Sequence, residues 1–113
     1  MERPVIYEKG DIVIFNFPFS NSLETKKRPS LIVAKLSGED VILCQITSQP
    51  RPDPDIITLA QKDFQSGGIK RESYLRPSIL FTIHSSRISY KAGRLKQAKI
   101  KEVEKKLCEI FTR

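Results

Sequence analysis

The sequence predicts a mainly β protein, built as a small, strongly bent antiparallel sheet or barrel and followed by one α-helix. Short apolar runs alternate with turn-forming residues up to about position 90, as is typical of a sheet with many short strands. These runs do not alternate with helical patterns, so a parallel sheet of strand–helix units is not expected. From Leu95 onward the apolar period becomes that of a helix. With 113 residues, the chain is expected to form one domain, 1–113, with a modest core.

Each expected strand is bounded by a proline, a glycine or a polar cluster. Gly10-Asp11 precedes the first strand and Pro18 ends it. The segment 37–40 is typical of a tight turn, so the second and third strands are expected to pair as a hairpin. A single helical turn is expected at 60–66, stopped by Gly67-Gly68. The strands are expected at 12–17, 30–36, 41–47, 56–59, 73–76, 78–83 and 88–90.

The last segment of the chain predicts an amphipathic helix. One helical face carries the apolar side chains, and lysines and glutamates occupy the rest of the surface. We expect that face to pack on the sheet or on a second subunit. Its residues are Ile100, Val103, Leu107, Ile110 and Phe111.

Composition excludes several classes of protein. No apolar run is long enough to span a membrane, and the N-terminus lacks the apolar core of a signal peptide, so the cytoplasm is the expected location. Cys44 and Cys108 lie in apolar patterns, and with a single histidine they make a poor metal site, so no metal is expected. The net charge of +7, concentrated in 86–113, favours a polyanion such as nucleic acid, although a basic surface also serves solubility.

Polar side chains gather where the second expected strand begins and the third ends. Arg28 precedes Pro29, so its backbone is biased toward an extended conformation, and its planar guanidinium matches a phosphate. In a hairpin, Thr47 lies at the same edge of the sheet as Arg28, and the loop that carries Glu24 reaches that edge too. An acid, a guanidinium and hydroxyls in one cleft suit phosphate binding and phosphoryl transfer. The neighbouring residues of this group are Lys26, Lys27, Ser48 and Gln49.

The second half of the chain supplies another basic group. Lys70, Arg71 and Arg76 surround Tyr74, and basic residues interleaved with an aromatic ring hold single-stranded nucleic acid through phosphate contacts and base stacking. His84 is the only histidine and a candidate acid or base, since histidine side chains exchange protons near neutral pH. All these candidates also have ordinary structural explanations, as solvated charges, turn residues or half-buried rings.

Several motifs occur in a specific order along the chain. They are Gly10-Asp11-Ile12-Val13, Arg28-Pro29, Leu31-Ile32-Val33, Ile46-Thr47-Ser48-Gln49, Gly67-Gly68-Ile69-Lys70, Ser73-Tyr74-Leu75-Arg76-Pro77 and Leu80-Phe81-Thr82-Ile83. With these motifs the chain resembles the MazF/PemK family of type II toxin–antitoxin toxins over nearly its whole length. The resemblance implies a small SH3-like (CcdB/PemK-like) barrel with a C-terminal helix, working as a homodimer.

The resemblance also implies an activity and partners. The activity is that of an mRNA interferase, an endoribonuclease that cleaves single-stranded RNA without metal or other cofactor. In that chemistry a 2′-OH attacks the neighbouring phosphate and leaves a 2′,3′-cyclic phosphate. The implied partner is a cognate antitoxin whose tail occupies the RNA-binding groove, and the toxin–antitoxin complex is implied to bind DNA.

The family's site residues map onto this chain one by one. Arg28 matches an arginine that acts at the scissile phosphate, and Thr47 a threonine that contacts it. Glu24 is the nearest candidate for an upstream acid, and Arg76 matches a second catalytic arginine of PemK-like members. The aspartate that accompanies that arginine is Ser78 here. The expected RNA-binding residues are Lys26, Lys27, Ser48, Gln49, Lys70, Arg71, Tyr74 and His84.

Two other functions remain open at this point. One is a barrel without catalysis that grips nucleic acid or an antitoxin-like tail, which the serine at position 78 favours. The other is a gyrase-targeting toxin, since a toxin family of that kind shares the barrel. Neither of these proteins would cleave RNA, so an RNA cleavage assay separates them from an endoribonuclease.

Overall fold

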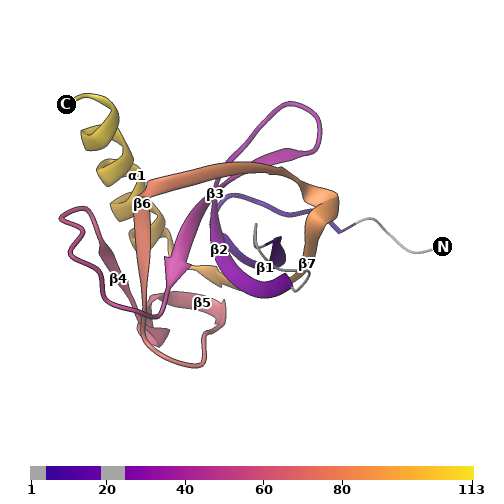
Figure 1. Cartoon of the computed structure of the whole chain (residues 1–113), viewed down its shortest axis with the longest axis horizontal. Helices are drawn as coiled ribbons and strands as arrows, with labels where there is room; N and C mark the ends of the chain where they lie inside the picture. The colour runs from indigo at the N-terminus through magenta and orange to yellow at the C-terminus, as the bar shows by residue number, and fades with distance from the viewer. Residues whose placement is uncertain (1–4, 19–24) are drawn as a thin grey trace.

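The computed structural model describes residues 5–18 and 25–113, and a curled antiparallel sheet forms most of it (Figure 1). The elements are β1 (Asp11–Pro18), β2 (Thr25–Lys35), β3 (Asp40–Thr47), β4 (Ile57–Leu59), β5 (Phe64–Gly67), β6 (Ser73–His84), β7 (Ile88–Leu95) and α1 (Gln97–Phe111). Within these residues the sheet has seven strands in the order β4-β6-β3-β2-β1-β7-β5, with every neighbouring pair antiparallel. The predicted fold class is therefore confirmed.

The sheet is buried on both faces by two apolar clusters. Adjacent residues in a strand point to opposite faces, so Ile12 and Leu31 join the cluster that includes residues of α1, whereas Val13 and Ile32 join the second cluster, on the other face. Each such side chain contributes about 1.5–3 kcal/mol when fully buried. Burial on both faces explains why the central strands are continuous apolar runs in the sequence rather than alternating ones.

The helix covers one face of the curled sheet with its first turns. Ile100 and Val103 are buried in the cluster under α1, and Leu107 packs against its margin. Phe111 is 70% exposed, so the last position of the predicted stripe does not pack on the sheet. No helix in the described residues is long and apolar enough to cross a membrane.

The predicted hairpin of the second and third strands is confirmed, but the second strand starts earlier than expected. β2 already begins at Thr25, so Arg28 and Pro29 lie inside a strand and not at its entry. Pro29 is opposite Ile14 of β1, and pairing with β3 starts one residue later, at Ser30. A proline is tolerated there because β3 does not require its missing N–H.

The expected break at Pro77 is also wrong, because β6 runs without interruption from Ser73 to His84. Cys44 pairs with Leu80 and Gln45 pairs with Arg76, so three residues of β6 bulge out opposite one step of β3. The bulge accommodates the proline and bends the strand, which helps the sheet to curl. The final strand was predicted at 88–90 and extends to Leu95, where β1 and β5 pair with it on either side.

Candidate nucleic-acid interface

An open groove of about 780 Å³ lies where the ends of β2 and β3 meet β7 and two loops. One loop follows β3 and brings Ser48, Gln49 and Arg51 to the groove, and the other precedes β6 and brings residues 68–71. Its apolar lining comes from the strands and from the second loop, through Ile14, Pro29, Ile46, Ile69 and Ala92.

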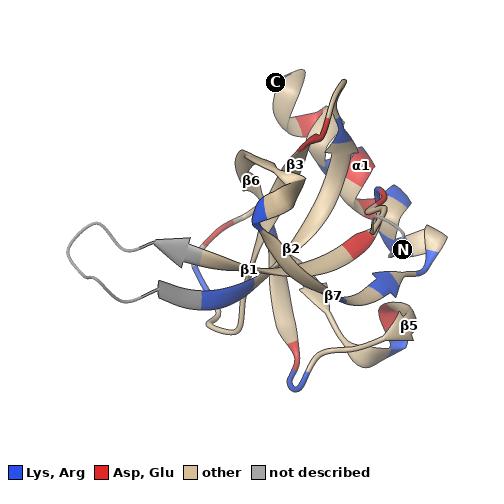
Figure 2. Ribbon diagram, turned by 90° about the vertical axis from the view of Figure 1, so that its right-hand side faces the viewer, with Lys and Arg blue, Asp and Glu red and all other residues tan. Residues whose placement is uncertain are grey.

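The charged lining of the groove is entirely positive. Arg28, Arg51, Lys70, Arg71 and Lys91 line it, and among the described residues no aspartate or glutamate does. No described acid lies within ion-pair distance of the exposed Arg51, Lys70 or Arg71. Figure 2 shows Lys and Arg at the start of β2 and in the loop before β6. A concave surface with charges of one sign attracts a polyanion.

Arg28 and Thr47 come together at this groove as the hairpin geometry predicts. Ser30 pairs with Gln45, so Arg28 and Thr47, each two residues further toward the same edge of the hairpin, lie on the same face of the sheet. Both line the groove, and Arg28 is half-buried there. The hydroxyl of Thr47 accepts a hydrogen bond of 3.1 Å from the backbone N–H of Gln49, which fixes the end of β3. A guanidinium and an oriented hydroxyl thus face the same space.

Most of the other predicted contacts also reach this groove. Ser48, Gln49, Lys70 and Arg71 line it together with Arg28. Lys27 is exposed on β2, and its Nζ lies 5.9 Å from the centroid of the Tyr90 ring. The predicted acid Glu24 and the side chain of Lys26 lie outside the described residues.

Two of the predicted RNA-binding residues, Tyr74 and His84, do not line the groove. Tyr74 is half-buried in β6 between Thr47 of β3 and Thr58 of β4. His84 is opposite Asp40 at the other end of β3, ~23 Å from Thr47 at about 3.3 Å per residue. There its Nε2 lies 3.2 Å from Glu39 and its Nδ1 accepts a 3.1 Å hydrogen bond from the backbone N–H of Ser86. The structure therefore does not bring His84 to the groove.

Three lining residues escaped the sequence analysis. Tyr90 is 51% exposed at the groove and is followed by Lys91, the same basic–aromatic pairing that drew attention to Tyr74. Lys91 Nζ lies 3.3 Å from Asp11, a carboxylate that also binds Arg94 at 3.0 Å. Arg51 stands between two prolines in the loop after β3, where local sequence gives no direction to its side chain.

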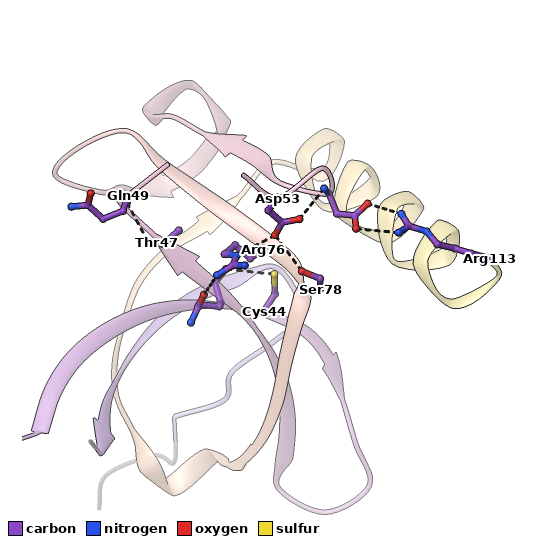
Figure 3. Close-up of polar contacts among 9 residues, drawn as sticks. Cys44, Thr47, Gln49, Asp53, Arg76, Ser78 and Arg113 are labelled. Carbon is purple, nitrogen blue, oxygen red and sulfur yellow. Dashed lines mark hydrogen bonds and ion pairs between the residues drawn. The ribbon is translucent and has the colours of Figure 1, made fainter. Parts of the chain in front are cut away.

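Arg76 belongs to a separate polar cluster beside the groove (Figure 3). Its Nε donates to Asp53 Oδ2 at 3.1 Å and its Nη1 to Gln45 Oε1 at 3.4 Å. Ser78 Oγ donates to the same Asp53 oxygen at 3.2 Å, and the backbone N–H of Asp55 donates to the other at 2.9 Å. The acid next to Arg76 is thus supplied by the loop after β3, while Ser78 holds that acid in place.

The donors around Asp53 keep its carboxyl group ionised. The hydrogen bond from the Asp55 N–H, together with Arg76 and Ser78, holds the pKa of Asp53 below its ordinary value of 3.8, against the opposing effect of burial. Because the pKa is lower in the folded than in the unfolded state, the resulting stabilisation is complete at neutral pH. This stabilisation is lost as the pH falls from the pKa that Asp53 has in the unfolded chain to below its pKa in the folded protein.

Cys44 lies under this cluster and is chemically inert. Its side chain is fully buried, and burial raises the pKa of the thiol to about 12, although the backbone N–H of Arg76 acts in the opposite direction. Cys108 is exposed on α1. Cys44 is therefore the core side chain that its apolar pattern indicates, whereas the same expectation is wrong for the exposed Cys108; neither cysteine lines the groove.

The fold is similar to that of solved MazF toxin structures. MazE–MazF from Deinococcus radiodurans (Form-II) has a TM-score of 0.74 at 19% identity, covering 96% of this chain and 98% of that one. Mycobacterium tuberculosis toxin MazF-mt6 has a TM-score of 0.70 at 17% identity, covering 90% and 96%. A mycobacterial endoribonuclease in complex with its cognate antitoxin has a TM-score of 0.68 at 15% identity, covering 95% and 96%. At these identities the likeness concerns the fold.

Sequence comparison identifies the family directly. No curated protein sequence matches the chain. Residues 8–111 match the profile of the PemK-like, MazF-like toxins of type II toxin–antitoxin systems, which is nearly the whole chain. The chain therefore belongs to the PemK-like, MazF-like toxins of type II toxin–antitoxin systems.

Proposed function

We propose that the protein is an endoribonuclease that cleaves single-stranded RNA at the basic groove without a metal ion. The observation that carries this proposal is the meeting of Arg28 and Thr47 in a groove whose described charges are all positive. Membership of a toxin family known for endoribonucleases supports it. RNA is the polyanion that brings its own nucleophile, the 2′-OH next to each phosphate.

The groove residues suit the steps of this reaction. The 2′-OH attacks the adjacent phosphorus and gives its proton to a base; the bond between phosphorus and the 5′-oxygen breaks, and that oxygen takes a proton from water, leaving a 2′,3′-cyclic phosphate. Arg28 stabilises the additional negative charge of the phosphorane, because its planar fork donates two parallel hydrogen bonds to phosphate oxygens. Thr47 and Ser48 orient the phosphate, and Glu24 is the proposed base.

A single strand fits this groove for a further reason. Tyr90 exposes its ring at the groove, with Lys27 within cation–π distance of it, so an unpaired base has a surface on which to stack. Base–aromatic stacking is worth about 1–3 kcal/mol per base. The neighbouring cations then contact the phosphates on either side.

The test is a cleavage assay with two matched substrates in EDTA. We expect a long RNA to be cut and its products to end in a 2′,3′-cyclic phosphate, while the all-DNA strand of the same sequence stays intact because it lacks the 2′-OH. Binding of the RNA without any cutting would identify a barrel without catalysis. Equal cutting of both strands, or a strict need for metal, would contradict the proposed reaction.

The salt dependence of binding tests whether the groove cations contact phosphates. For single strands the slope of log K against log salt changes by about 0.7 per phosphate contact. Lys70→Ala is therefore expected to reduce the slope by about 0.7 for an uncleavable RNA analogue. The control is Lys101→Ala, which removes an exposed lysine of α1 that does not line the groove. A similar change in both variants would show that only net charge matters.

The same proposal includes the partners of the groove. An antitoxin tail rich in acidic side chains complements the five lining cations and competes with RNA for them. A homodimer and a cytoplasmic location are part of the proposal on the strength of the family. Inhibition of RNA cleavage by the antitoxin tests the first partner. The mass of the toxin measured by light scattering tests the homodimer.

A further inference from the structure

Asp53 brings a buried carboxylate to Arg76 from another part of the fold. It lies in the loop between β3 and β4, and its side chain is only 7% exposed. Its two oxygens accept the three hydrogen bonds described above, from Arg76, Ser78 and the backbone of Asp55. With these donors in place the carboxylate is a poor proton acceptor, so its effect must pass through the guanidinium that it binds.

The sheet register places that guanidinium next to the groove. Residues opposite each other in a sheet point to the same face, so Thr47 and Tyr74 form one row across β3 and β6. Arg28 lies two residues before Ser30 and therefore on the same face of β2 as Ser30. Ser30, Gln45 and Arg76 form the next row on the same face. Diagonal neighbours in such rows are about 7–8 Å apart, which a long side chain spans.

The contacts of Arg76 hold its guanidinium in one orientation and leave donors available. Asp53 binds Nε and Gln45 binds Nη1, so the plane of the guanidinium is fixed from two sides. An arginine has five N–H donors, and in the described part of the chain the others of Arg76 make no hydrogen bond. Those donors are available to a ligand on this face of the sheet.

The loop that carries Asp53 is itself anchored to the end of α1. Asp55 binds Arg113, with Nη2 at 2.5 Å from Oδ1 and Nη1 at 3.3 Å from Oδ2, and Figure 3 shows this contact beside the Asp53 cluster. Lys106 Nζ lies 3.9 Å from the same carboxylate. Asp55 in turn provides the backbone N–H that holds Asp53. The acid is therefore presented by a fixed loop.

We propose that Asp53 is a positioning residue for RNA cleavage, which orients Arg76 so that its remaining N–H groups bind the scissile phosphate together with Arg28. The inference rests on the proposed endoribonuclease function. It assigns the acid partner of Arg76 to Asp53, in a loop far in sequence from β6. Position 78 of β6, where the resemblance places an aspartate, holds a serine.

The test is a double-mutant cycle on cleavage. Asp53→Asn keeps the shape of the side chain and removes its charge, and we expect it to lower kcat by about 10–100-fold with little change in KM. If Asp53 acts through Arg76, the same substitution has no further effect in an Arg76→Ala background. Asp40→Asn is the matched control, because Asp40 lies at the opposite end of β3 from the groove.

A rescue variant separates positioning from a role in folding. Ser78 Oγ lies 3.2 Å from Asp53 Oδ2, so Ser78→Asp places a carboxylate close to the same point from β6. We expect Asp53→Asn combined with Ser78→Asp to cleave faster than Asp53→Asn alone and to recover most of the lost kcat, with circular dichroism confirming folded samples. Unchanged cleavage by Asp53→Asn, or an equal loss in the Arg76→Ala background, overturns the inference and leaves the proposed function standing. An original protein that cuts no RNA overturns both.

Discussion

Replacing Arg28 with alanine is expected to lower the rate of RNA cleavage by about 10²–10³-fold while the fold remains intact. Arg28 is half-buried in the groove that Thr47 also lines, where its guanidinium can meet the charge that develops on the phosphate at short range. Alanine removes that stabilisation from the transition state and leaves the lysines that attract RNA in place. Single-turnover cleavage of a mapped RNA measures the loss, and thermal unfolding checks the fold.

Two further variants define what Arg28 contributes. Arg28→Lys keeps the positive charge without the planar fork, so we expect cleavage between that of the alanine variant and that of the original protein. Arg87→Ala is the matched control, since Arg87 is exposed next to His84 at the far end of β6. Full cleavage by Arg28→Ala would place the chemistry elsewhere in the molecule.

Gly67→Ala is expected to lower the free energy of unfolding by about 2–5 kcal/mol. Gly67 has φ of +66°, a left-handed conformation that costs a side chain energy. A Cβ built there would lie 2.2 Å from the backbone oxygen of Ala92, so β5 would have to move away from β7. Since the loop after Gly67 carries Lys70 and Arg71, cleavage should fall as well. Urea unfolding measures the stability change.

Gly38→Ala provides the comparison for this effect. Gly38 also has a left-handed φ, of +79°, but a Cβ there meets nothing within 4 Å. Its substitution reports the backbone strain alone, which we expect to cost about 1–2 kcal/mol. An equal loss in both variants would mean that the contact with Ala92 relaxes at no cost.

The strands were predictable wherever burial alone decides them. The runs around Ile12, Leu31 and Leu43 are apolar because both faces of the sheet are covered, and each was located from composition and turn residues. The two errors at prolines have one cause. A strand tolerates Pro29 or Pro77 when the neighbouring strand does not need its N–H, and that depends on pairing between segments far apart in sequence.

The residues of the candidate site were also predictable only where local structure determines their position. The meeting of Arg28 with Thr47 followed from hairpin geometry, which adjacent strands and a short turn determine locally. The placement of Asp53 did not follow, because its loop contains three prolines and is held by Arg113, 58 residues away from Asp55. Tyr90 and Lys91 were missed because the strand that presents them gains its stability from both neighbours rather than from its own residue preferences.

The burial of Cys44 gives the protein an internal reporter of sheet opening. Because the thiol reacts only as the thiolate, a reagent in solution modifies Cys108 rapidly and reaches Cys44 only when β3 separates from β2 and β6. The ratio of the two modification rates then gives the free energy of that opening under native conditions. Since Cys44 is adjacent to Gln45, which contacts Arg76, a bound RNA or antitoxin that tightens the site would slow this reaction without any added label.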